Sequence, residues 1–423
     1  MTNAQRTNKH SLSLNAQGLA TVTLSANWND QSASHEENLY VGNMSIWREA
    51  DLLPESIGQH LVGSQAGDHL QTLIQPGEKI ALWDKKLQIT TQPTRFDQYY
   101  RKGMTVTPRL GRFYPQGFIK GVNEIFQDAI APIRITALND DQLSVDLNHP
   151  LAHYPLRISL FINEVLPGSD RRGGRCISPL DDLLQYPGLS APLQNGHSID
   201  YGDNEDGMSR MDDRTDNVFY AIQRMKQHLD SQARETVNTL YKRLIPSEAK
   251  VLDLMASFDS HLKTIPFSEL HLLGMNKEEL DANKLATHQA VVQNLNENSS
   301  LSFEDDSLDA IICTVSIEYL TNPVAVLSEA MRVLCPGGMI IITFSNRWFP
   351  TKAVKVWSDL HEFERVGMVT QWLERAGGKD IHTYSLRGLP RPENDAHAGE
   401  TPYSDPIYAV WAYKTDWPAA NGG

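Results

Sequence analysis

From residue 216 onward the sequence alternates helical periods with short apolar runs, and this alternation constrains the fold more than any other feature. Short runs that are apolar on both faces are typical of buried parallel strands. Strands and helices that alternate in this way predict a doubly wound, mostly parallel α/β sheet over residues 216–415, with ligands at the carboxyl ends of its strands. The expected strands are KVLDLM (250–255), LHLLGM (270–275), LDAIICTV (308–315) and MIIITFS (339–345), and the expected helices are 217–244, 278–293 and 323–334.

The first part of the chain has a different texture. Residues 1–35 are polar and poor in large apolar side chains, so we expect a flexible N-terminal segment there. Residues 36–165 contain short alternating runs separated by turn residues, which predicts a mostly β domain. Residues 166–215 are rich in Gly, Pro, Asp and Asn and are interpreted as a linker or lid segment, and 416–423 as a tail.

Composition excludes several classes of protein. The formal charge of −14 argues against a broad nucleic-acid surface, since phosphate binding needs clustered Lys and Arg. No apolar run is long enough to span a membrane, so we expect a cytoplasmic protein without membrane contact, and leave a homo-oligomer open. The basic cluster RRGGR (171–175) is assigned to the linker. Because Cys176, Cys313 and Cys335 lie far apart, we expect neither a disulfide nor a metal site.

Five segments stand in a fixed order in the second half: VLDLMASFDSH (251–261), LGMNKEEL (273–280), LSFEDDSLDAIICTVSIEYL (301–320), EAMRVLCPGGMIIITFSN (329–346) and DPIYAVWAYK (405–414). In this order they resemble the class I S-adenosylmethionine (SAM) dependent methyltransferases. The resemblance implies an α/β Rossmann-like domain, SAM as the cofactor and S-adenosyl-L-homocysteine as the product. It also implies in-line transfer of a methyl group to a bound nucleophile, in which positioning supplies most of the acceleration.

The cofactor side departs from that family at two places. Met255, Ser257 and Asp259 occupy positions that are normally glycine, and Gly274 stands where an acid normally bonds the ribose. We expect Asp253 and Asp259 to accept from the cofactor's ammonium group and Asn276 to reach a ribose hydroxyl, while residues 294–296 match the adenine-binding region. The predicted cofactor residues are Asp253, Met255, Ala256, Ser257, Phe258, Asp259, Gly274, Met275, Asn276, Asn294, Leu295, Asn296, Thr314, Val315 and Ser316.

The acceptor side is expected to come from the helix before the first strand and from the loops after the fourth and fifth strands. On that helix Val218, Ile222, Met225 and Leu229 would form the core stripe, and His228, with an ordinary pKa near 6.5, would be a general base on another face. An ordinary solvated or packing role is the alternative for each candidate. The predicted acceptor-side residues are Tyr220, Arg224, His228, Glu318, Tyr319, Asn346 and Arg347.

Aromatic side chains near these loops can hold a cation through their ring faces. The candidates for a wall around the sulfonium are Phe258, Tyr319, Trp348 and Phe349, with an ordinary core position as the alternative for each.

The segment PIRITALNDDQLSVDLNHPLAHYPLRISLFINEV (132–165) resembles the SlyD-type branch of the FKBP prolyl isomerases, with VDLNHPLA as its most specific part. The resemblance implies an FKBP-like domain over residues 36–165. The aromatic and acidic members of the isomerase pocket have no residue-by-residue match here, so isomerase activity is not predicted.

The leading interpretation is a SAM-dependent methyltransferase that acts on a small-molecule acceptor. Sulfur of a small thiol is the expected nucleophile, because a thiol is already partly ionised and needs no strong base. One alternative is a protein methyltransferase or a chaperone-like binding module, in which the FKBP-like domain recruits a polypeptide. A second alternative is a non-catalytic SAM-binding scaffold.

Overall fold

The computed structural model describes residues 12–103, 105–123, 125–168, 178–185 and 190–415, so the basic cluster at 171–175 and the tail at 416–423 lie outside the described residues. The strands are β1 (Leu19–Asn29), β2 (Ala33–Ser45), β3 (His69–Ile74), β4 (Gln88–Thr91), β5 (Phe113–Pro115), β6 (Pro132–Leu138), β7 (Leu143–Asp146), β8 (Leu156–Leu166), β9 (Ala249–Leu254), β10 (Phe267–Gly274), β11 (Val291–Val292), β12 (Leu308–Thr314), β13 (Leu334–Phe344), β14 (Lys379–Arg387) and β15 (Ile407–Tyr413). The α-helices are α1 (Ile46–Glu49), α2 (Glu55–Leu61), α3 (Pro179–Gln185), α4 (Asp216–Phe219), α5 (Ser231–Leu244), α6 (Lys277–Ala282), α7 (Pro323–Val333), α8 (Lys355–Asp359) and α9 (Glu362–Arg375).

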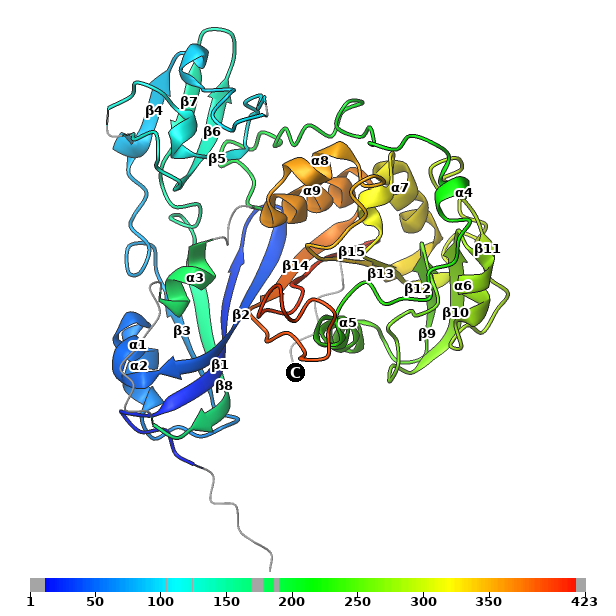
Figure 1. The fold of residues 1–423 in the computed structure, drawn as a ribbon, viewed down its shortest axis with the longest axis horizontal. Coiled ribbons are helices and arrows are strands. Elements are labelled where there is room, and N and C mark those ends of the chain that lie inside the picture. The colour runs from blue at the N-terminus through cyan, green and yellow to red at the C-terminus, as the bar shows by residue number, and fades with distance from the viewer. Residues whose placement is uncertain (1–11, 104, 124, 169–177, 186–189, 416–423) are drawn as a thin grey trace, which may run out of the picture.

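One long sheet runs through the molecule in the order β11-β10-β9-β12-β13-β15-β14-β2-β1-β8-β3 (Figure 1). Strands β11, β10, β9, β12 and β13 are parallel, and β15 is antiparallel to both β13 and β14. The doubly wound, mostly parallel sheet predicted for the second half is therefore confirmed. Within the described ranges, every helix is too short or too polar to cross a bilayer.

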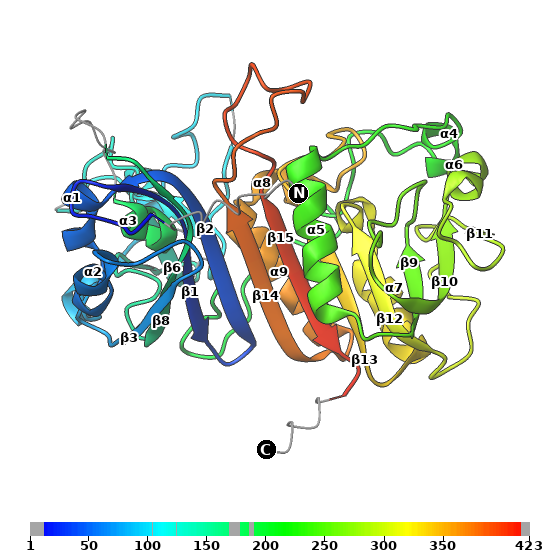
Figure 2. The same ribbon diagram turned by 90° about the horizontal axis from the view of Figure 1, so that it is seen from below.

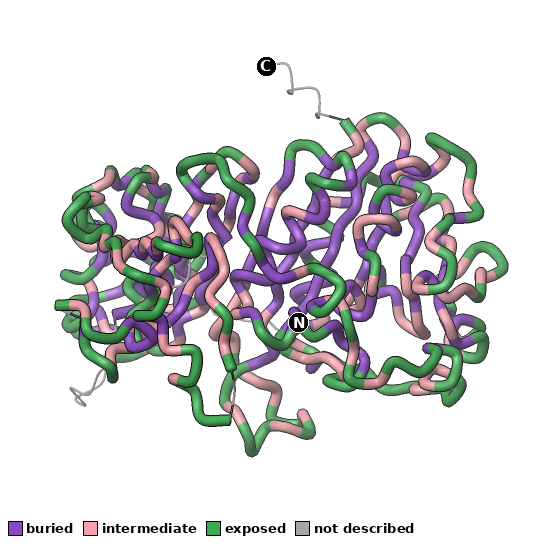
Figure 3. The backbone as a smooth tube through the Cα atoms, turned by 90° about the horizontal axis from the view of Figure 1, so that it is seen from above, coloured by how far each residue is buried: buried purple, intermediate pink, exposed green. Residues whose placement is uncertain are grey.

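Helices cover both faces of this half of the sheet (Figures 1 and 2). On one face Val237 and Tyr241 of α5 pack against apolar residues of β9, β10 and β13. On the other face Val326 and Leu327 of α7 join residues of α9, β12 and β13 in a second cluster. Because both faces are covered, the central strands are apolar on both sides, and Figure 3 shows them as the buried centre of the fold.

The N-terminal strands contradict part of the expected flexible segment. Residues 19–29 form β1, a strand inside the sheet, and Ala20, Val22, Leu24 and Ala26 are fully buried on one of its faces. Backbone pairing with β2 on one side and β8 on the other orders this strand, and β8 lies more than 100 residues away in the sequence. The segment from residue 19 to 35 is therefore ordered β-structure, and the prediction of flexibility there is wrong.

Strand β2 joins β14 in parallel, with partners that run from Ile381 and Ala33 to Arg387 and Leu39. Polar side chains at this junction are paired although they are buried: His35 Nδ1 lies 2.8 Å from Thr383 Oγ1, and Glu37 accepts from the hydroxyl of Ser385. The two predicted domains therefore share one sheet and are not joined by a linker alone. This junction is polar in its side chains and continuous in its backbone hydrogen bonds.

Residues between β3 and β8 form a separate small sheet in the order β4-β7-β6-β5, which lies apart from the long sheet (Figure 1). It has its own apolar core, which includes Phe96, Phe118, Ile133 and Val145. The mostly β character predicted for residues 36–165 is confirmed by these strands.

Two predicted helices are much shorter than expected. Helix α5 begins at Ser231 because the carboxylate of Asp230 caps it by accepting from Ala233 N at 2.9 Å. Residues 220–230 are irregular, and α6 ends at Ala282 although a helix to residue 293 was predicted. The proposed core stripe is wrong as well, because Val218 and Ile222 are 57% and 73% exposed.

The buried Glu37 at the junction makes stability depend on pH. Burial raises the pKa of Glu37 from 4.5 to about 7, so the folded protein holds this proton over a pH range in which the unfolded chain releases it. The free energy of unfolding should therefore fall as pH rises from about 4.5 to 7, by on the order of 3 kcal/mol from this group. We expect Glu37→Gln to be more stable than the wild type at pH 8 and to differ little from it near pH 4.5. Urea unfolding at both pH values tests this, and an unchanged pH dependence would contradict it.

Candidate functional site

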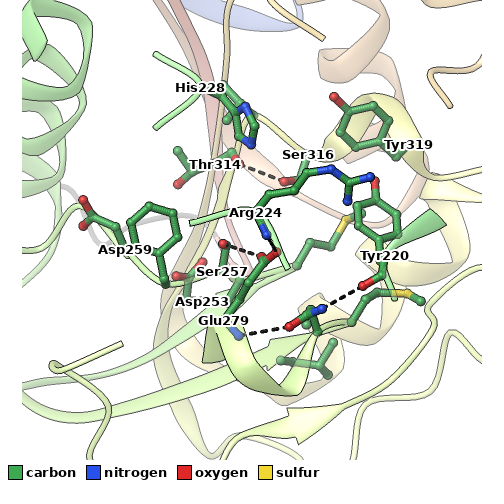
Figure 4. Close-up of a pocket in the computed structure, with 18 of the residues that line it drawn as sticks. Tyr220, Arg224, His228, Asp253, Ser257, Asp259, Glu279, Thr314, Ser316 and Tyr319 are labelled. Carbon is green, nitrogen blue, oxygen red and sulfur yellow. Dashed lines mark hydrogen bonds between the residues drawn. The ribbon is translucent and has the colours of Figure 1, made fainter. Parts of the chain in front are cut away.

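A cavity lies at the carboxyl ends of β9, β10 and β12 (Figure 4), the edge where the sequence predicted ligands. It spans about 1180 Å³ when the space at its mouth is included. Its floor is formed by the ends of the strands, with Asp253 from β9, Gly274 from β10 and Thr314 from β12. The cavity is therefore built by the topology of the sheet.

The predicted cofactor residues all line this cavity, together with Tyr220, Arg224, His228 and Tyr319 from the acceptor side. Several lining residues were not predicted. Those residues are Asp216, Lys226, Gln227, Leu229, His261, Leu273, Glu279, Gln293 and Leu320.

The loops at the strand ends have an unusual backbone. Met255 and Val315 have φ angles of 61° and 44°, a left-handed conformation that is costly for residues other than glycine and above all for a β-branched one. Met255 thus keeps the glycine-like backbone at a position where glycine was expected. Gly274 itself is required, because a Cβ there would lie 2.3 Å from the carbonyl oxygen of Ala256. Position 274 therefore has no room for the acid that the family resemblance led us to look for.

Two aspartates that line the cavity differ in their protonation. Asp253 is 3% exposed, and burial raises the pKa of this carboxyl to about 7. Asp259 is only half-buried, and its carboxylate accepts hydrogen bonds from Gln227 Nε2 at 2.7 Å and from His261 N at 3.0 Å. Partial burial raises its pKa, but the nearby His261 and these hydrogen bonds lower it more, so the pKa lies below the ordinary value. Asp259 is therefore the ionised carboxylate near neutral pH, whereas Asp253 is partly protonated.

Glu279 is a lining residue that the sequence analysis missed and that bonds to two separate segments. Its carboxylate accepts from Ser257 Oγ at 2.7 Å and from Arg224 N at 2.6 Å, so it links the loop after β9 to residues 220–228. A local signal for it exists, because Asn276 caps α6 by accepting from Glu279 N. An Asn at the cap with an acid three residues later, directly after a strand, marks a helix start at a strand end.

Two of the three amide residues predicted to bind the cofactor, Asn276 and Asn296, hold parts of the protein together. Asn276 donates from Nδ2 to the carbonyl of Tyr220 at 2.8 Å, and Asn296 donates to Asp216 at 2.8 Å and to the carbonyl of Tyr319 at 2.9 Å. These bonds hold residues 216–220 over the mouth of the cavity. Both amides line the cavity, but their hydrogen-bonding groups are largely committed to the protein.

Tyr220, Arg224 and His228 reach the cavity although they do not lie on a helix (Figure 4). The ring of His228 stands edge-on to Phe349, with centroids 5.1 Å apart, and its nitrogens form no hydrogen bond to another described residue. Desolvation against its neighbours lowers the pKa of His228 below 6.5. Its imidazole is therefore neutral at pH 7 and can accept a proton.

Three predicted acceptor-side residues do not line this cavity. Glu318 is 1% exposed, burial raises its pKa to about 8, and its Oε2 has no hydrogen-bond partner among the described residues. Asn346 lies in a separate cleft between β2 and the loop before β15. Arg347 lines an adjoining hollow with Trp348, and its guanidinium is 2.8 Å from His397 Nε2. His228, Tyr319 and Phe349 line both that hollow and the cavity, so the two spaces are neighbours.

Comparison with known proteins identifies the central part of this region. Residues 256–342 match the family model described as a methyltransferase domain. The ubiquinone/menaquinone biosynthesis C-methyltransferases UbiE of Roseobacter denitrificans and Bartonella henselae are each 31% identical, over 98 and 132 residues, or 23% and 30% of this chain. The matched parts cover 38% and 48% of those relatives, so the chain spans less than half of their length.

A solved SAM-dependent methyltransferase of Thermotoga maritima, described as a possible histamine N-methyltransferase, is 14% identical with a TM-score of 0.30, and the match covers 43% of this chain and 89% of that one. A score this low carries no conclusion about substrate. The family model matches residues 256–342 and does not test the N-terminal region, so the resemblance of that region to the FKBP isomerases stays a prediction. Residues 256–342, which include most of the cavity's floor, form a methyltransferase domain of the class that uses SAM as its cofactor.

Proposed function

We propose that this chain transfers a methyl group from SAM to a small-molecule nucleophile in the cavity of Figure 4. The observation that carries the proposal is the convergence at three strand ends of an ionised carboxylate, a polar loop and a neutral imidazole. The matched methyltransferase domain supports it, because that domain contributes the loops after β9, β10 and β12.

The lining residues suit SAM. Asp259 offers a negative charge for the ammonium group, and Glu279, whose two oxygens each retain a lone pair, offers acceptors for ribose hydroxyls. Leu273, Met275 and Leu295 provide an apolar surface for the adenine ring. We assign the ribose contact to Glu279, since the amide of Asn276 is already bonded to the protein.

Bound SAM supplies an electrophilic methyl group on a sulfonium and leaves as neutral S-adenosyl-L-homocysteine. His228 accepts the proton that the nucleophile loses, because its imidazole is neutral and its nitrogens are not bonded to any residue that the structure describes. A general base of this kind typically contributes about 10² to 10⁴ in rate. Phe349 and Tyr319 place aromatic rings beside the reacting region, where they can attract a cation.

The adjoining hollow defines the class of acceptor that we propose. Tyr319, Trp348 and Phe349 form an aromatic lining, and Arg347 adds a positive charge. This suits a flat acceptor with an anionic group and an acidic O–H or C–H proton, for which His228 is the base. The relatives are named as C-methyltransferases, and neither they nor the site supports the thiol acceptor that the sequence suggested.

The shared sheet favours a structural role for the N-terminal region over a detachable recruiting module. Pairing with β2 covers the edge of β14 along residues 381–387. Removal of the N-terminal strands would expose that edge within the methyltransferase half. An FKBP-like origin of this region is compatible with its antiparallel strands β1, β2, β3 and β8, and we keep it as a proposal about ancestry.

The function is tested with the full chain and a panel of acceptors. Phenols, activated C–H acids, amines and thiols are incubated with SAM, and formation of S-adenosyl-L-homocysteine is measured. We expect turnover with an aromatic acid or a related flat anion. Turnover with thiols alone would overturn the acceptor class, and failure to bind SAM in calorimetry would overturn the proposed function.

For the base, we expect His228→Ala to lower kcat by about 10² to 10⁴ while SAM affinity changes less than twofold. The wild-type rate should rise with pH through the pKa of His228, below 6.5, and then level off, whereas the variant's rate should keep rising as the acceptor itself ionises. His197→Ala, at an exposed position, is the control. An unchanged kcat in His228→Ala would remove this residue from the reaction.

For the cofactor contact, we expect Glu279→Ala to weaken SAM binding by about tenfold or more, since two segments lose a shared charged acceptor. The neighbouring Glu278, an exposed residue of the same helix turn, supplies the matched control Glu278→Ala. Calorimetry measures both affinities. Equal affinities in the two variants would show that Glu279 does not hold the cofactor.

A further inference from the structure

One glutamate and two histidines, side chains that can bind metal ions, lie together where the loop after α6 packs against strand β10. Glu269 and His271 stand two residues apart on β10, so their side chains share a face of the strand. His288 comes from the loop between α6 and β11. One ligand atom from each residue lies within 4.8 Å of the other two. These residues do not belong to the lining described for the cavity at the strand ends.

Backbone and hydroxyl bonds hold the loop against the strand at this point. Thr287 N donates to the carbonyl of Leu270 at 3.1 Å, and Leu270 N donates to Thr287 Oγ1 at 2.8 Å. His288 is thereby fixed beside His271, and the two rings stack with centroids 4.1 Å apart and planes 21° apart. The ring of Phe303 packs nearly perpendicular to the ring of His271, with centroids 5.4 Å apart. The two imidazoles are therefore arranged before any ion binds.

Thr287 also supports the ligating form of His288. The hydroxyl of Thr287 lies 3.2 Å from the carbonyl of Leu270 and 2.9 Å from His288 Nδ1. When the hydroxyl donates to that carbonyl, its oxygen accepts the proton of Nδ1, and Nε2 carries a free lone pair. A partner that holds one ring nitrogen and leaves the other to ligate is the usual support of a metal-binding histidine.

Glu269 supplies the negative charge. Its Oε1 lies 3.3 Å from Lys250 Nζ, while its Oε2 lies 3.0 Å from His271 Nε2 and 3.8 Å from His288 Nε2. Oε2 and both Nε2 atoms therefore face one small volume at which the side chains remain partly exposed to solvent.

We propose that Glu269, His271 and His288 form a binding site for Zn²⁺. Two imidazole nitrogens and one carboxylate oxygen are a ligand set that Zn²⁺ accepts, with water in the remaining position. On binding, the proton that His271 shares with Glu269 is released to solvent. The ion would fasten the loop after α6 to β10 and so stabilise the outer strands of the sheet. This revises the sequence-based expectation of no metal site, which rested on the spacing of the cysteines.

Calorimetric titration of the untagged, chelator-treated full chain with ZnCl₂ tests the proposal. We expect one Zn²⁺ per chain and a higher melting temperature of the loaded protein. His288→Ala, at a half-exposed loop position, should lose this binding. Thr287→Val should weaken it by about 10- to 100-fold by removing the hydroxyl that supports the ligating form of His288, and Thr287→Ser should restore it.

His382→Ala is the matched control, because His382 pairs with Asp380 at 3.1 Å as His271 pairs with Glu269. Circular dichroism of the metal-free variants checks that each is folded. Absence of stoichiometric Zn²⁺ binding in the wild type would overturn the proposal. Equal binding by wild type and folded His288→Ala, or loss of binding in His382→Ala alone, would overturn it as well.

Discussion

The parallel hydrogen bonds between β2 and β14 are the interaction on which the arrangement of the whole chain depends. Without them β14 would be an edge strand with a row of unpaired backbone groups. Their register also brings His35 to Thr383 and Glu37 to Ser385, so a slip of one residue would leave buried polar groups without partners. The junction thus specifies one alignment of the two halves, and the other N-terminal strands add outward from β2.

A second constraint acts over the cavity. Asp216 accepts from Arg210 at 2.7 Å and from Asn296 at 2.8 Å, and the buried Lys352 lies 3.3 Å from it. Glu279 and Asn276 then hold the next turns of the chain through backbone atoms. The residues that face the acceptor therefore sit on an irregular segment that is fixed by long-range polar bonds. Such a segment can position Tyr220 and His228 where a regular helix would not place both.

The sequence pattern correctly predicted those strands and helices whose formation depends mainly on nearby residues. The strands β9, β10, β12 and β13 and the helix α7 follow from apolar runs and helical periods, and parallel strand ends then bring the cofactor residues together. The helix expected at residues 217–244 is interrupted at residues 220–230, where distant side chains such as Glu279 bind the backbone, and no sequence pattern records those partners. Likewise, the position of Glu318 inside the core depends on how the loop after β12 turns.

The topology of the sheet has a consequence for biosynthesis. Strand β2 leaves the ribosome more than 300 residues before its partner β14 exists, since His35 and Thr383 are 348 residues apart in the chain. At ordinary elongation rates that interval is on the order of tens of seconds. During that time the backbone groups on the free edge of β2 have no partner strand and can pair with other chains. Correct folding therefore requires that this edge be protected until the last tenth of the polypeptide emerges.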